Sequence, residues 1–290
     1  MKGRLATLAR VGWLCGIGIL LGLTATVLSR GIFLFSAGVG AFISAPLACI
    51  LLYSGMAVGT RLLLGSNKTD RPKLLSSLRL QPPVGDRRLL ARLLLGAALA
   101  AISLPQLAAL LVLQGQDIAE PTRAFIVQTY PNPVWGWAIS LWFPVFLVPF
   151  VEESVFRGWL QTRLEQVIAP AYAILTAAVL FAAIHWQHWS NPGLFLLPLS
   201  LGLLMGWTLH VSGSLWSAFF IHSLWNASAF SVGFLRLRLQ PTAGWGFALA
   251  AIGGVVLVLV GLRTVATASS RLMSDKVATQ THDQEGVGLA

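Results

Sequence analysis

Two adjacent acidic residues at the end of an apolar stretch are the first candidates for chemistry. The chain has only ten acidic residues, and Glu152 and Glu153 directly follow the apolar run that ends at Val151. On a helix Arg157 lies one turn after Glu153, so the two side chains can form a charge-assisted pair. Glu152 is rotated by about 100° from Glu153 and is free to face another helix. One carboxylate could then orient the site while the other acts as an acid or base, although a plain ion pair at a helix end also fits this motif.

Histidine and asparagine occur in two further apolar stretches. Phe181 and His185 are four residues apart, as are His222 and Asn226, so each pair shares one face of a helix. Ionisable residues inside spanning helices are costly, and they usually face a bundle interior or a wet cavity and serve a function. A structural role for His185, or a helix-to-helix hydrogen bond from His222 and Asn226, fits the sequence equally well.

The connection between the first two motifs allows them to meet. Glu152 precedes Ala169 by 17 residues and His185 follows it by 16. If two helices form a hairpin that turns near Ala169, both residues lie about 25 Å from the turn and face each other at one depth. Pro149 frees the carbonyl of Val145, and broken helices at membrane depth normally border a polar cavity.

The elements that hold these residues are predicted to be membrane-spanning helices. The chain is 56% hydrophobic and 10% charged, with a mean hydropathy of +0.75, whereas soluble domains have about 25% charged residues. Lipid must therefore be the solvent for most of the surface. The net charge is +10, and the basic residues that produce it lie between apolar runs. The sequence contains no nucleic-acid-binding motif, so we expect no nucleic-acid partner. The expected fold is all-α, a polytopic transmembrane bundle of about eight spanning helices.

The expected spans and regions follow the apolar runs. The spans are Val11–Leu28, Ile32–Thr60, Leu89–Leu113, Val134–Phe156, Ala171–His188, Leu194–His210, Ser214–Gly233 and Trp245–Leu262. Residues 1–133 would hold the N-terminal transmembrane helices and a basic cytoplasmic loop, and 134–233 a catalytic helix bundle. Residues 234–265 would hold the last transmembrane helix and 266–290 a disordered tail.

Positive charge predicts how the helices are oriented. Basic residues precede the first span and fill the segment Ser66–Arg92, so both termini are expected in the cytoplasm, with Arg236 and Arg238 as exceptions. The expected location is the plasma membrane of a bacterium. The first apolar run is longer than a signal peptide core and predicts an uncleaved helix. Gln161–Val167 is expected to lie at the interface, with Arg157 among the charges held at the headgroups.

The three motifs, in this order, resemble the CAAX prenyl protease and bacteriocin-processing family of intramembrane endopeptidases, also called CPBP or Abi. Its pattern is EExxxR, FxxxH and HxxxN or HxxxD, which corresponds here to Glu152–Arg157, Phe181–His185 and His222–Asn226. The resemblance covers about Val134 to Gly233. It implies an intramembrane endopeptidase that hydrolyses a peptide bond of a membrane-associated protein or peptide with a water activated by Glu and His.

The hypothetical mechanism assigns a role to each motif residue. Glu152 would be the general base, with His185 assisting, while His222 and Asn226 would stabilise the oxyanion. Glu153 and Arg157 would fix the helix end. In a metalloprotease version Glu152, His185 and His222 would bind zinc, leaving Glu153 as a candidate base.

Two other classes of protein remain open from the sequence. A non-catalytic immunity or scaffold protein of the same family could use the polar cluster to bind a partner. A transporter could use intramembrane Glu and His to relay protons, but the chain lacks the paired repeats common among secondary transporters.

Overall fold

The structure is a computed structural model that describes residues 2–35, 78–111, 143–185, 192–239 and 245–287. Within these ranges the secondary structure is helical and no strand occurs, as the all-α prediction requires. The helices are α1 (Lys2–Phe35), α4 (Arg87–Leu111), α9 (Pro170–Ala183), α10 (Pro192–Ser212), α11 (Leu215–Leu239) and α12 (Trp245–Val287). Between α4 and α9 a further helix consists of η1 (Phe143–Leu147), α7 (Val148–Glu153), η2 (Ser154–Gln161) and α8 (Thr162–Leu164).

The helices form a membrane bundle, as predicted. Four of the described helices contain a stretch long and apolar enough to cross a membrane: Ala6–Thr24, Arg87–Leu107, Leu194–Ser212 and Ile252–Asp275. Pro170–Ala183 is apolar but shorter. The count of eight stays a prediction, because most of the expected span Ile32–Thr60 and the start of Val134–Phe156 lie outside the described residues.

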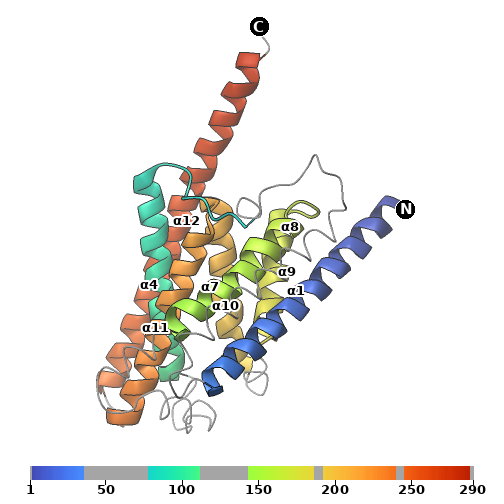
Figure 1. Cartoon of the computed structure of the whole chain (residues 1–290). Coiled ribbons are helices and arrows are strands. Elements are labelled where there is room, and N and C mark those ends of the chain that lie inside the picture. The colour runs from blue at the N-terminus through green and yellow to red at the C-terminus, as the bar shows by residue number, and fades with distance from the viewer. Residues whose placement is uncertain (1, 36–77, 112–142, 186–191, 240–244, 288–290) are drawn as a thin grey trace.

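Helix packing joins the described helices into one bundle. α4 packs along α12 and also contacts α11 and α10, while α10 contacts α9 (Figure 1). α1 crosses the segment 143–164 and contacts η2 and α7. α4 and α12 approach closely at Gly96 and Gly261, where a Cβ on either residue would lie within 2.7 Å of the other's carbonyl oxygen. Small residues permit such close backbone approach in membranes, where the hydrophobic effect does not drive helix association.

The helix from Phe143 to Leu164 is wider than an α-helix over much of its length. η1 and η2 have π-helical geometry, which is rare and often occurs at functional sites. The Ser154 hydroxyl donates to the carbonyl of Phe150, and the Thr162 hydroxyl donates to the carbonyl of Arg157. These hydroxyls bind backbone carbonyls near both ends of η2. The paired glutamates end α7, directly before this segment.

Two sequence predictions differ from the structure. Residues beyond 265 were expected to form a disordered tail, whereas α12 is helical to Val287. The reason is that α12 is still packed against the bundle at this point, because Val265, Ala268 and Leu272 are buried in the core at helical spacing. Arg157 was expected at the headgroups, but it is fully buried, because Glu153 of its own helix and the Gly202 carbonyl of α10 supply partners for its charge.

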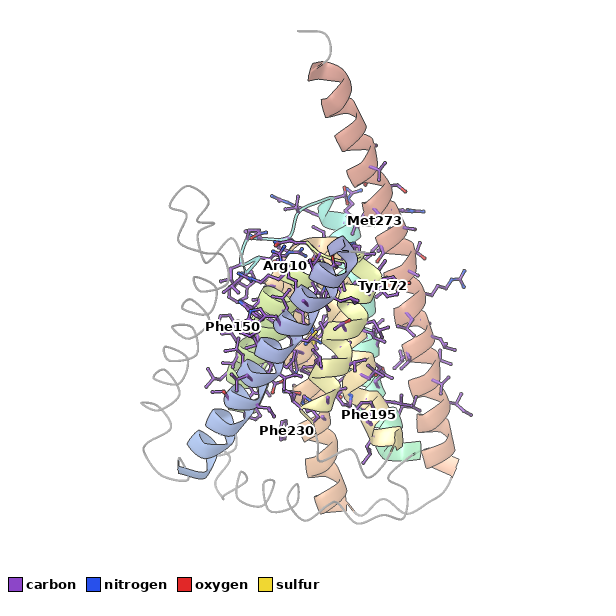
Figure 2. All side chains as sticks on the ribbon, turned by 90° about the vertical axis from the view of Figure 1, so that its right-hand side faces the viewer. Arg10, Phe150, Tyr172, Phe195, Phe230 and Met273 are labelled. Carbon is purple, nitrogen blue, oxygen red and sulfur yellow. The ribbon has the colours of Figure 1, made fainter. Side chains whose placement is uncertain are left out.

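The two ends of the chain lie at the same end of the bundle. Figure 1 shows the N-terminus, the start of α4 and the end of α12 together at the upper end. In the rotated view Arg10 on α1 and Met273 on α12 again lie near the upper end, and Phe195 and Phe230 lie near the lower end (Figure 2). Both termini can lie on the same side of the membrane only if they share one end of the bundle, as they do here. The side itself, and the region bounds expected from the sequence, stay predictions.

Candidate active site

The two glutamates, Arg157 and His222 form one buried cluster. Glu153 Oε2 lies 3.2 Å from Arg157 Nε, and Glu153 Oε1 lies 2.9 Å from His222 Nδ1. His222 Nε2 lies 3.8 Å from Glu152 Oε2. The four side chains have at most 8% of their area exposed. Buried charges require partners, and here one carboxylate contacts both a guanidinium and an imidazole.

Phe181 connects the second motif to this cluster. Its ring lies 4.4 Å from Arg157 Cζ, within range of a cation–π contact. The Phe181 ring centroid is 4.7 Å from that of His185 and 5.6 Å from that of His222. His185 Nδ1 is 2.7 Å from the Phe181 carbonyl, which fixes the direction of the imidazole ring. The structure thus places His185 beside the cluster, separated from His222 by one aromatic ring.

Asn226 lies one turn after His222 on α11 and contacts the backbone of η1. Its Nδ2 donates to the carbonyl of Pro144 over 2.7 Å. In a π-helix the carbonyl of residue i bonds to the N–H of residue i+5, and for Pro144 that residue is Pro149, which has no N–H. The proline therefore leaves the Pro144 carbonyl for Asn226, one position earlier than the carbonyl of Val145 expected from α-helical spacing. One of the two amide hydrogens of Asn226 is used in this bond.

The backbone carbonyls of two glycines outside the three motifs accept hydrogen bonds from Arg157 and Gln161. Arg157 Nη2 donates to the Gly202 carbonyl at 3.2 Å, and Gln161 Nε2 donates to the Gly206 carbonyl at 2.9 Å. A Cβ on Gly202 would lie 3.0 Å from Ala178 and 3.3 Å from Arg157 Nη2. The signal in the sequence is the small-xxx-small spacing of Gly202 and Gly206, which is typical of close helix contacts in membranes.

A second charged cluster lies at the turn between α8 and α9. Glu165 pairs with Arg79, contacts His210 Nδ1 at 3.2 Å and accepts a hydrogen bond from Gln161 at 3.0 Å. Burial alone would raise the pKa of the Glu165 carboxyl, but the hydrogen bonds from His210 and Gln161 and the charge of Arg79 lower it to about 2. This carboxylate stays ionised at neutral pH and ties the segment that contains Arg79 to the helix carrying the paired glutamates.

The expected zinc ligands do not form a ligand set here. Within the described part of the chain, no group of three His, Cys, Asp or Glu side chains is arranged to hold a metal ion. His222 Nδ1 contacts Glu153 and His185 Nδ1 contacts the Phe181 carbonyl, and contacts of this kind also orient histidines at metal sites. Zinc binding by Glu152, His185 and His222, which would require these side chains to come together, stays a prediction.

Comparison with known proteins identifies the segment that holds all three motifs. Residues 134–228 match the family model described as type II CAAX prenyl endopeptidase Rce1-like. The Rce1-like segment includes the paired glutamates, Phe181, His185, His222 and Asn226, and it confirms the resemblance inferred from the motifs.

A relative with a similar stretch is the uncharacterized protein YpbD of Bacillus subtilis (strain 168). It is 31% identical over 85 residues, which cover 29% of this chain and 41% of the relative. The chain thus matches less than half the length of that relative. The match supports the fold of a CAAX-type intramembrane protease family for the Rce1-like segment, and α1, α4 and α12 lie outside this segment.

Proposed function

We propose that this protein is an intramembrane endopeptidase that hydrolyses a peptide bond of a membrane-associated protein or peptide. The observation that carries the proposal is the position of His222 between Glu152 and Glu153, inside a bundle of apolar helices. A plain helix-end ion pair would need only Glu153 and Arg157. The added imidazole from α11 brings an acid–base group to the same buried point.

The contacts of Glu153 favour an orienting role for this carboxylate. Both of its oxygens are engaged, one with Arg157 and one with His222. A carboxylate that accepts a hydrogen bond at Nδ1 fixes a histidine tautomer and leaves Nε2 as the working nitrogen. In His222 that nitrogen is directed toward Glu152. Glu152 and His222 Nε2 thus form the working pair of the proposed site, with Glu153 and Arg157 as positioning residues.

The proposed reaction is direct attack of water on the amide. Glu152 accepts a proton from water, and the water oxygen forms a bond to the carbonyl carbon of the substrate. In its doubly protonated form His222 keeps its Nδ1–H on Glu153 and donates its Nε2–H to the resulting oxyanion, assisted by the second amide hydrogen of Asn226. The proton taken by Glu152 then passes to the leaving nitrogen, with His185 assisting, and the C–N bond breaks to give a carboxylate and an amine.

The test is a cleavage assay with the full-length protein reconstituted in lipid vesicles together with a set of membrane-anchored peptides. Products are identified by mass spectrometry, so that the cleaved bond is read directly. Glu152→Gln keeps the shape of the side chain and removes the base, and we expect product formation to fall by about 100-fold or more. His222→Gln is expected to cause a loss of similar size.

The matched control is Glu165→Gln, which makes the same change at a buried glutamate outside the proposed site. Melting temperature and elution volume are recorded for each variant, so that unfolding is separated from loss of chemistry. We expect folded Glu165→Gln to retain activity. Product formation by folded Glu152→Gln at the wild-type rate would overturn the role of this residue, and a wild-type protein that cleaves none of the anchored peptides would favour the scaffold alternative.

A further inference from the structure

A hollow lined by charged residues lies between the start of α4 and the late part of α12. Its volume is about 490 Å³, and it is open to one side. The hollow is lined by Asp86, Arg88, Leu89, Arg92, Ser270, Arg271, Ser274 and Asp275. Arginine guanidinium groups are well suited to bind phosphate groups, because their planar donors match the phosphate oxygens.

The guanidinium groups in this hollow are not used by the fold. Among the described residues, Arg88, Arg92 and Arg271 form no side-chain ion pair. Arg88 and Arg92 are exposed and lie four residues apart on α4, where like charges repel each other. An anion bound between them would remove this repulsion.

The two acidic residues of the hollow do not neutralise it. The Asp86 carboxylate caps α4, because its Oδ1 accepts the backbone N–H groups of Arg88 and Leu89 at 2.8 and 2.9 Å. Its charge is thus engaged with the helix terminus. Only Asp275 remains against the three arginines, so the hollow has an excess of positive charge.

The position of the hollow indicates what kind of phosphate compound it binds. The apolar span of α4 begins at Arg87, and the apolar span of α12 ends at Asp275. The hollow therefore lies where both helices leave the hydrocarbon, at the depth of the lipid headgroups. Basic pockets between transmembrane helices at this depth bind the headgroups of anionic lipids.

We propose that this hollow binds the phosphate headgroup of an anionic phospholipid, with Arg88, Arg92 and Arg271 as the contacts to the phosphate. Ser270 and Ser274 lie one turn apart on α12, where their hydroxyls donate to the backbone carbonyls of Thr267 and Ser270, so the contacts to the phosphate come from the arginines. The bound lipid would bridge α4 and α12 at the end of their shared interface.

The test is native mass spectrometry of the purified full-length protein in detergent with equal amounts of phosphatidylglycerol and phosphatidylcholine. We expect wild type to retain the anionic lipid in preference to the zwitterionic one. Each of Arg88→Gln, Arg92→Gln and Arg271→Gln is expected to lower retention of the anionic lipid by about fivefold. The matched control is Arg87→Gln, which removes the same charge from the same helix end but from outside the hollow, and its effect should be much smaller.

A second arm separates a lipid site from a site for soluble phosphate. Millimolar inorganic phosphate should leave most of the bound phosphatidylglycerol in place, because a free ion lacks the acyl chains that lie against the helices. The proposal is overturned if inorganic phosphate displaces the lipid completely, if Arg87→Gln lowers retention as much as Arg88→Gln, or if all three hollow variants retain the lipid like wild type. The single variants alter exposed side chains, and their melting temperatures establish that they are folded.

Discussion

Arg157 has three kinds of partner inside the bundle. It pairs with Glu153 at 3.2 Å, donates to the Gly202 carbonyl and lies over the Phe181 ring. Together these contacts come from its own helix, from α10 and from α9. A guanidinium offers five donors in a fixed plane, so one side chain can join three elements. Its burial is therefore a consequence of the site rather than an exception to the rule that charges stay in water.

Removing this guanidinium should destabilise the protein as well as slow it. Arg157→Ala leaves the Glu153 carboxylate buried without its guanidinium partner, in contact with the His222 imidazole. Breaking a buried ion pair by removing one partner costs about 3–5 kcal/mol. We expect a clear fall in the melting temperature of the full-length protein in detergent, and a smaller fall for Arg157→Lys, which keeps the charge. Arg10→Ala, at an exposed arginine of α1, serves as the control; equal melting of Arg10→Ala and Arg157→Ala would contradict this account.

The contacts inside one helix could be predicted from the sequence, but those between helices could not. The Glu153–Arg157 pair follows from helical spacing alone, because residues four apart share a face. The contact of His222 with both glutamates depends on how α11 is rotated against α7, which is set by packing over the whole bundle. Asn226 could not be assigned to Pro144 for a different reason, since α-helical spacing points to Val145 and the π-helical segment moves the free carbonyl by one residue.

At the scale of elements, glycines lie where neighbouring helices approach each other closely. Gly96 of α4 and Gly261 of α12 bring two backbones together, and Gly202 of α10 admits Arg157 and lies against Ala178 of α9. Sequence periodicity identified these segments as helices because their apolar runs are long. Which glycines lie at contacts could not be read from the runs, because Gly253 of α12 meets nothing within 4 Å.

A methyl group at the α4–α12 contact should separate the two helices. The Cβ of Gly96→Ala would lie 2.7 Å from the Gly261 carbonyl oxygen and 2.9 Å from Thr264 Cβ. Overpacking of this kind costs about 1–3 kcal/mol, so the melting temperature should fall. Gly253→Ala makes the same change on α12 in open space and should be neutral or stabilising by up to about 1 kcal/mol. Thermal unfolding of the two variants in the same detergent compares them directly, and a Gly96→Ala protein as stable as Gly253→Ala would rule out the close contact.

At the scale of the whole molecule, the Rce1-like segment is enclosed by helices from outside it. α4 packs against α10 and α11, and α1 covers the helix that holds the glutamates. Composition predicted the membrane bundle because a chain with so few charges cannot present its surface to water. The role of the flanking helices could not be predicted, since they carry no motif and their contacts depend on the assembled fold.

The end of the bundle that α1, α4 and α12 share leads to a prediction of membrane topology that labelling can test. The N-terminal end of α1, the start of α4 and the end of α12 lie at one end of the bundle (Figure 1). Most of the basic residues near helix ends, among them Arg10, Arg87 and Arg271, belong to these three segments. The positive-inside rule therefore predicts that this end faces the cytoplasm, although Arg236 and Arg238 at the end of α11 oppose it.

Single cysteines in a background without Cys15 and Cys49 report the side directly. A membrane-impermeant maleimide added to intact cells should label Gly193→Cys, at the start of α10, because that end of α10 lies opposite the termini (Figure 2). Arg10→Cys and Val277→Cys should react only after the membrane is opened, since both positions lie beside the basic end. Labelling of Arg10→Cys and Val277→Cys from opposite sides would contradict the shared end itself. Labelling of both in intact cells would instead keep the arrangement and reverse its orientation, which would mean that Arg236 and Arg238 outweigh the larger basic cluster.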